Sequence, residues 1–128
     1  MKFITYSVPM DQDGHSKRYD LEERTAQFAG QSRDFVKKLP RTIGNIEDAK
    51  QFIRASGSVG ANYIEANDAI GEKDFVMKVK ICRREAKESR YWLRLLDVGE
   101  SLAAERKRLG LEAEELMKIF GAIVRKCE

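Results

Sequence analysis

Apolar side chains recur every three or four residues along most of the chain, the spacing that places them on one face of an α-helix. The pattern predicts a first helix that begins with Asp20 as N-cap and Glu23 reaching back to it, and that ends at Pro40. A second helix is predicted from Asn45, as its N-cap, to a break at Gly71. Its inward stripe is expected to comprise Ala49, Phe52, Ile53, Ser56, Val59, Gly60, Tyr63, Ile64, Asn67 and Ile70.

The third predicted helix has the most regular apolar face. Its stripe alternates steps of three and four residues, and consists of Phe75, Val79, Cys82, Ala86, Ser89, Leu93 and Leu96. The pattern then weakens, so that residues 101–108 are expected to be a loop or a frayed helix, and Gly110 a further break. A fourth helix follows, to Cys127, with acidic residues early and basic residues late, as the helix dipole favours. These elements predict an all-α, antiparallel up-and-down four-helix bundle over residues 20–128.

Residues 1–19 have no such periodicity and are expected to form a flexible N-terminal arm, or a strand-like segment held by Phe3, Ile4 and Tyr6. No apolar run approaches the roughly 20 residues that span a bilayer, and the first residues are too polar for a signal-peptide core. Cys82 and Cys127 stand far apart on apolar stripes and are expected to be reduced core residues. We therefore expect a cytoplasmic protein without a membrane partner.

Groups that catalyse reactions are scarce. The one histidine, His15, lies in the predicted arm, and neither cysteine has a neighbour at metal-ligand spacing. Glu85 and Glu88 form a carboxylate pair, but Arg84 and Lys87 flank them, so that surface ion pairs are the expected outcome. The sequence predicts no catalytic residues, no metal site, no cofactor and no small-molecule substrate.

The chain has 24 basic and 21 acidic residues and a net charge of +3, which permits nucleic-acid binding without requiring it. The third helix concentrates six cations on one side, away from its apolar stripe: Lys80, Arg83, Arg84, Lys87, Arg90 and Arg94. Such a row is suited to phosphate contacts, and Tyr91 and Trp92 beside it are candidates for base stacking, although Trp92 can equally be buried. The alternative is a solvated face without a ligand.

A segment of small residues in the second helix contains Gly57 and Gly60, each of which costs about 1 kcal/mol relative to Ala inside a helix. A close approach of another helix, within the bundle or from a second subunit, would offset that cost. Asn62 and Glu65 lie next to it on one helix face, where they are able to interact or to cap a neighbouring backbone.

Several blocks of the sequence resemble a bacterial family of four-helix-bundle proteins, which includes proteins encoded in intervening sequences of 23S ribosomal RNA genes. The similarity is carried by residues 56–66 (SGSVGANYIEA), 73–75 (KDF) and 80–93 (KICRREAKESRYWL), with further matches at 20–25 and 114–125. The resemblance implies an antiparallel four-helix bundle that assembles as a ring-shaped homopentamer, with no established enzymatic activity. Related accessory proteins of diversity-generating retroelements bind nucleic acid and a reverse transcriptase through a basic ring surface.

From the residues and the resemblance together, we expect a non-enzymatic homo-oligomer that binds ribosomal RNA or another nucleic acid through the basic face of its third helix. The alternative is a protein-interaction scaffold without nucleic-acid contact.

Overall fold

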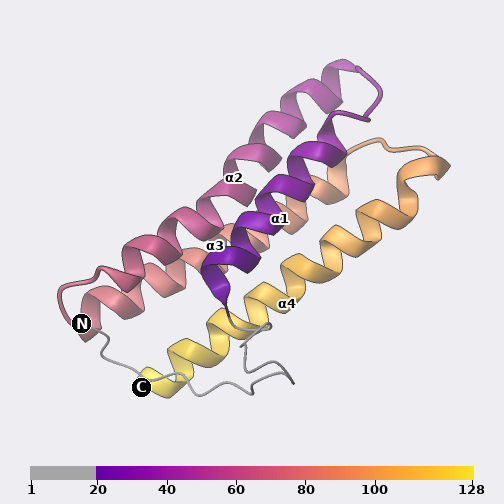
Figure 1. The fold of residues 1–128 in the computed structure, drawn as a ribbon. Coiled ribbons are helices and arrows are strands. Elements are labelled where there is room, and N and C mark those ends of the chain that lie inside the picture. Colours follow the sequence, from indigo (N-terminus) through magenta and orange to yellow (C-terminus); the bar gives the residue numbers. More distant parts are fainter. Residues whose placement is uncertain (1–19) are drawn as a thin grey trace.

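The computed structural model describes residues 20–128, which form four long helices and one short 3₁₀ helix. They are α1 (Leu21–Val36), α2 (Ile43–Asn67), α3 (Glu72–Leu95), η2 (Glu100–Leu102) and α4 (Ala103–Cys127). Consecutive long helices run antiparallel; α3 packs between α2 and α4, and α1 covers the opposite side of the bundle (Figure 1). The predicted all-α four-helix bundle is confirmed.

The core is continuous from one end of the bundle to the other and is built around four fully buried phenylalanines: Phe28, Phe35, Phe52 and Phe120. The predicted stripe of α3 faces this core: six of its members are buried, and Phe75 is partly buried against them. Two members of the predicted α2 stripe are exposed, however. Ile64 is 50% exposed beside the core-packed Tyr63, and Ile70 is 95% exposed because α2 has already ended at Asn67.

Side chains at the helix starts only partly follow the prediction. Asp20 caps α1, since its carboxylate accepts a hydrogen bond from Glu23 N at 3.2 Å, but the Glu23 side chain bonds to Gln27 and not back to Asp20. Asn45 is not the N-cap of α2. Thr42 takes that role, with Oγ1 accepting from Asn45 N at 3.1 Å, which leaves the buried Asn45 amide free for contacts elsewhere.

The region expected to be a loop or a frayed helix belongs to α4, which runs without a break from Ala103 through Gly110. The prediction of a break was wrong because two buried leucines anchor this charged stretch on the core. Leu102 lies directly before α4, and Leu109 lies about two turns into it. Gly110 faces α3, where a Cβ would lie 3.8 Å from Leu93 Cδ2. The predicted break at Gly71 is confirmed: Gly71 lies directly before α3, as Gly99 lies directly before η2, and their φ angles of 131° and 66° are ones that other residues rarely adopt.

The expected arm, residues 1–19, lies outside the described residues, and so does His15. Among the helices of residues 20–128, none is both long and apolar enough to cross a membrane.

Candidate functional site

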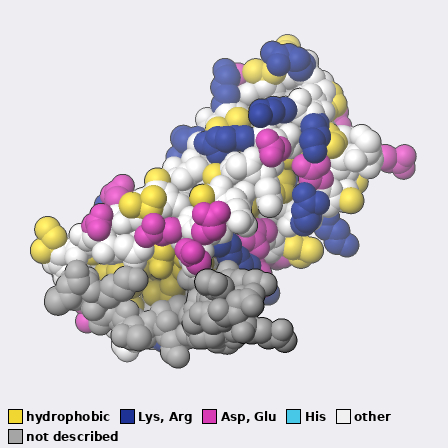
Figure 2. Space-filling model, viewed as in Figure 1, with side chains coloured by type: hydrophobic (Ala, Val, Ile, Leu, Met, Phe, Trp, Pro, Cys, Tyr) yellow, Lys and Arg dark blue, Asp and Glu magenta, His cyan; other side chains and the backbone are white. Residues whose placement is uncertain are grey.

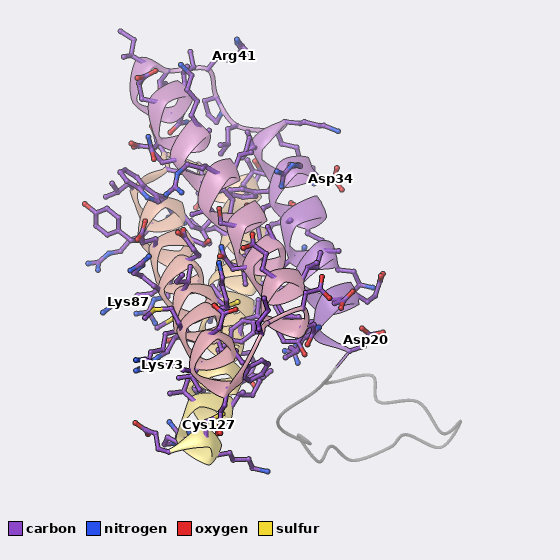
Figure 3. All side chains as sticks on the ribbon, turned by 90° about the vertical axis from the view of Figure 1, so that its left-hand side faces the viewer. Asp20, Asp34, Arg41, Lys73, Lys87 and Cys127 are labelled. Atoms are coloured by element: carbon purple, nitrogen blue, oxygen red, sulfur yellow. The ribbon has the colours of Figure 1, made fainter. Side chains whose placement is uncertain are left out.

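The six predicted cations of α3 lie on its outer side, and we call them the basic row: Lys80, Arg83, Arg84, Lys87, Arg90 and Arg94. All are exposed except Arg90, which is half-buried. Figure 3 shows Lys87, together with Lys73 of the same helix, pointing away from the bundle on the side opposite Asp20 and Asp34. The row is therefore open to solvent in this chain.

Ion pairing leaves most of the basic row uncompensated. Arg90 Nη1 donates to Glu114 Oε1 of α4 at 2.8 Å. The other five cations have no carboxylate within 4 Å among residues 20–128. Because no neighbouring carboxylate neutralises them, these five cations are the groups best placed to bind an anionic ligand.

Two carboxylates of α3, those of Glu85 and Glu88, turn toward α2 instead of the basic row. Arg54 of α2 holds them, with Nη2 at 3.8 Å from Glu85 Oε1 and 3.4 Å from Glu88 Oε1. Glu85 and Glu88 thus form ion pairs, as expected, but their partner is Arg54 of α2 and not the flanking Arg84 or Lys87, and Glu85 is buried and not on the surface. The consequence is a segregation of charge, with the negative groups on the α2 side of the helix and the row of cations on its free side.

Helix α4 extends the positive surface at one end of the row. Arg106 and Lys107 line a hollow of about 380 Å³ between α3 and α4, together with Arg90, Leu93, Arg94, Gly110, Leu111 and Glu114. Arg106 is anchored there, since its Nη1 donates to Leu96 O at 2.6 Å. Sequence reasoning missed Arg106 and Lys107 because it left residues 101–108 without a helical face. On the side of the molecule that carries α1, Figure 2 shows both signs of charge, with Lys and Arg more frequent over the end where α2 begins and Asp and Glu more frequent toward the other end.

The two aromatic residues beside the row have different surroundings. Tyr91 is 55% exposed, whereas Trp92 packs against the core. Their rings meet edge to face with centroids 5.2 Å apart. Tyr91 is thus the one of the pair whose ring is available for stacking on a base.

The small-residue segment of α2 lies against α1 of the same chain. A Cβ at Gly60 would come within 2.7 Å of Thr25 Oγ1, and one at Gly57 within 3.1 Å of Arg33 Nη2. Asn62 and Glu65 do not bond to each other: Asn62 Nδ2 donates to Ser58 O at 2.9 Å, and Glu65 accepts from Lys78 of α3 at 2.9 Å. These contacts are between or within helices of one protomer.

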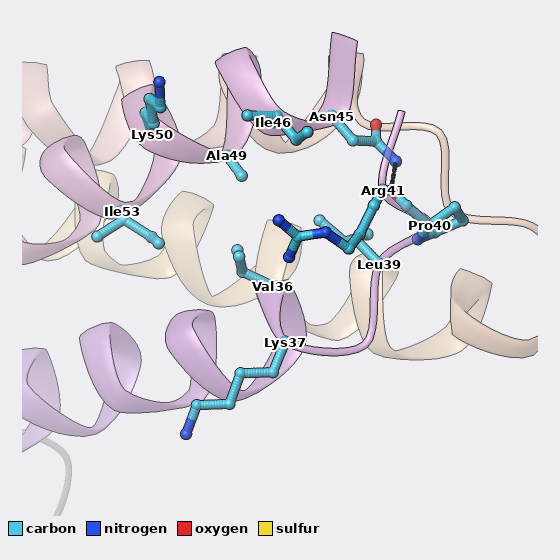
Figure 4. Close-up of a pocket in the computed structure, with 10 residues that line it drawn as sticks. All are labelled: Val36, Lys37, Leu39, Pro40, Arg41, Asn45, Ile46, Ala49, Lys50 and Ile53. Atoms are coloured by element: carbon cyan, nitrogen blue, oxygen red, sulfur yellow. Dashed lines mark hydrogen bonds between the residues drawn. The ribbon is translucent and has the colours of Figure 1, made fainter. Parts of the chain in front are cut away.

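A second hollow, of about 440 Å³, lies between the end of α1 and the start of α2 (Figure 4). Its walls are largely apolar, with Val36, Ile46 and Ile53 among them, and Lys37, Arg41 and Lys50 at its rim. Two of these cations are engaged: Lys37 with Asp34 at 3.7 Å and Lys50 with Glu47 at 3.1 Å. Within residues 20–128, no group of three or more His, Cys, Asp and Glu is placed to hold a metal ion.

Comparison with known proteins identifies a family and a similar solved structure. The sequence model of the 23S rRNA-intervening sequence protein family matches residues 17–122. A solved structure of a protein of unknown function from the S23 ribosomal protein family of Bacteroides thetaiotaomicron superposes with a TM-score of 0.71 and 30% sequence identity, covering 81% of this chain and 97% of that one. A search of curated proteins gives no match.

Proposed function

This chain belongs to the 23S rRNA-intervening sequence protein family, and we propose that it is a non-enzymatic, self-associating protein that binds RNA or DNA through the basic row. The observation that supports the proposal is the exposure of five cations on one side of α3 that have no carboxylate partner among residues 20–128. A solvated helix face usually carries both acidic and basic residues. On α3, in contrast, the basic row lies on the outer side, and Glu85 and Glu88 face α2.

The chemistry of the row fits the nucleic-acid backbone better than the bases. Arg and Lys neutralise phosphates and release the counterions condensed on the strand, which gives affinity that depends steeply on salt and little on sequence. Lys80 and Arg94 are fourteen residues apart, about 21 Å along the helix at 1.5 Å per residue, so several consecutive phosphates can be contacted at once. Tyr91 adds a ring that can stack on an unpaired base.

Self-association would strengthen such binding. In a homopentamer, the net charge of +3 per chain becomes about +15 per assembly, and contacts that are weak in one subunit add through avidity. Light scattering at micromolar concentration tests this part directly. A mass of one chain would contradict it.

The decisive experiment reverses two charges of the row. Arg83→Glu with Arg84→Glu is compared with Lys37→Glu and Lys50→Glu, which makes the same change in net charge on the α1–α2 side. Fluorescence anisotropy with a labelled structured RNA and a labelled duplex DNA is measured from 50 to 200 mM salt. We expect the α3 variant to lose at least tenfold in affinity and to lower the slope of log K against log salt by about two, with the control little changed.

The competing function is a protein-interaction scaffold in which the row binds an acidic protein. Wild-type protein that fails to bind RNA or DNA at 50 mM salt, or an equal loss in both double variants, would favour the scaffold and contradict our proposal. Light scattering of each variant establishes that the oligomer is intact, so that a loss of binding is not a loss of assembly.

A further inference from the structure

Two arginines from different helices converge over a glycine between α3 and α4. At the position that a Cβ would take on Gly121 of α4, Arg125 Nη1 lies 3.4 Å away and Arg83 Nε 3.7 Å away. Gly121 itself is buried, whereas both arginines are exposed. Since both atoms lie this close to one point, Arg83 Nε and Arg125 Nη1 are at most 7.1 Å apart (3.4 plus 3.7 Å), over a position that carries no side chain.

This convergence brings like charges together with nothing to balance them. Neither Arg83 nor Arg125 has a carboxylate within 4 Å among residues 20–128. Lys80 and Lys87 stand about one turn away on either side of Arg83, both exposed and similarly unpaired. Two neighbouring guanidinium groups repel each other, and an anion that accepts hydrogen bonds from both relieves the repulsion.

We infer that Arg83 and Arg125 form a two-sided clamp for one phosphate group, with Gly121 as its floor. A guanidinium presents several N–H donors in a fixed plane that matches the oxygens of a phosphate, so two of them can bind a single phosphate from both sides. The inference rests on the proposed function for the source of that phosphate, the nucleic-acid backbone. The same geometry also accepts free inorganic phosphate, and the test separates the two sources.

The clamp makes a prediction that a diffuse basic surface does not. Lysine keeps the charge but lacks the planar fork, so Arg→Lys is harmless in a diffuse row and harmful in a clamp. We expect Arg83→Lys and Arg125→Lys each to weaken binding of a labelled RNA by about fivefold or more, against less than twofold for the control Arg41→Lys, an exposed arginine outside the basic row, between α1 and α2. Because both arginines hold one phosphate, the double variant should lose less than the product of the two single losses.

A second measurement keeps the clamp testable if RNA does not bind. In ¹H–¹⁵N spectra of the arginine Nε–Hε groups, inorganic phosphate should shift the signals of Arg83 and Arg125 at concentrations that leave the Arg41 signal unmoved. RNA binding that is equal for all three Arg→Lys variants overturns the clamp and leaves the proposed function standing. Phosphate shifts without RNA binding support the clamp with free phosphate as its ligand and contradict the proposed function. If RNA does not bind and these signals do not shift, both are overturned.

Discussion

Asn45 pairs with the backbone of Asp97 through both ends of its side-chain amide. Its Nδ2 donates to Asp97 O and its Oδ1 accepts from Asp97 N, each at 2.8 Å. The same Nδ2 also donates to Pro40 O at 2.9 Å, a bond drawn in Figure 4. The residue is only 4% exposed. One buried amide therefore ties the α1–α2 connection to the residue that follows α3, 52 positions further along the chain.

Replacing Asn45 should destabilise the fold more than its size suggests. Asn45→Ala leaves a backbone N–H and two carbonyls at this end of the bundle without their partner, and each lost bond of this kind costs about 1 kcal/mol. We expect a loss of about 2–3 kcal/mol in the free energy of unfolding, measured by urea denaturation with circular dichroism at 222 nm. The matched control is Asn62→Ala, which removes one bond within α2 and should cost less than about 0.5 kcal/mol. Equal losses in the two variants would show that the Asn45 bridge has no special role.

The glycines of α1 and α2 should respond to alanine in opposite directions. At Gly60, the new Cβ would lie 2.7 Å from Thr25 Oγ1 and 3.1 Å from Thr25 Cβ, and Thr25 is 1% exposed with its hydroxyl bonded to Leu21 O. Since Thr25 has no room to move, Gly60→Ala should cost about 1–3 kcal/mol. At Gly30 a Cβ would meet nothing within 4 Å, and Ala should stabilise by up to about 1 kcal/mol.

Thermal melts of the two variants measure this difference, and Gly57→Ala is the intermediate case. Its Cβ would meet only the end of the Arg33 side chain, which is exposed and can swing aside. Gly57→Ala should therefore be close to neutral. A Gly60→Ala variant that melts at or above the wild-type temperature would mean that α1 and α2 are not held at this separation.

An ion pair with two short hydrogen bonds connects α1 to α4. Arg24 Nε donates to Glu112 Oε2 and its Nη2 to Glu112 Oε1, both at 2.8 Å, and the side chains are only 20% and 26% exposed. A double-mutant cycle to alanine should give a coupling energy of about 1–2 kcal/mol. The same cycle on the exposed pair of Lys50 and Glu47 should give less than about 0.5 kcal/mol. Couplings of similar size would contradict the assignment of Arg24 and Glu112 as a structural link.

Local patterns in the sequence were sufficient for much of this architecture. The stripe from Val79 to Leu93 needs only the helical period to be recognised, and the Asp20 cap depends on a residue three positions away. The outer position of the basic row follows from the same period, because residues about 120° from a buried stripe must face outward unless another helix covers them. Helical periodicity therefore predicts well the relationships between residues that are a few positions apart on the same helix.

Partnerships between distant residues could not be read in this way. Asn45 was predicted to be a cap because asparagine is a common N-cap residue. Its actual bridge to Asp97 could not be predicted, because it joins two connections that only the folded bundle brings together. Glu85 was assigned to its neighbours in sequence, whereas its partner, Arg54, comes from α2. The approach of Arg125 to Arg83 likewise depends on the register of α3 against α4, which no single helix determines.

The two cysteines should differ sharply in reactivity. Cys82 is 0% exposed, and burial raises the pKa of its thiol to about 12, from an ordinary value of 9.0. Cys127 is half-buried near the end of α4, with Sγ donating to Ile123 O at 3.1 Å. Because the thiolate is the reactive form, iodoacetamide at pH 8 should label Cys127 in the folded protein and Cys82 only in urea, as mass spectrometry of tryptic peptides can determine. Labelling of Cys82 without denaturant at the rate of Cys127 would show that the core opens there.

The same thiol should make the fold sensitive to alkali. Between pH 9 and 12 the folded protein keeps the Cys82 proton and the unfolded chain loses it, so the free energy of unfolding falls as pH rises, by at most about 1.4 kcal/mol per pH unit. Burial also raises the pKa of Tyr63 above its ordinary 10.0, which acts in the same direction. Below about pH 8 neither group contributes a slope, because the unfolded thiol and phenol are both still protonated there. Urea denaturation from pH 7 to 10.5 should therefore show a decline in the free energy of unfolding. We expect Cys82→Ala to reduce this decline and Cys127→Ala to leave it largely in place. An undiminished decline in Cys82→Ala would assign the alkaline sensitivity to other groups.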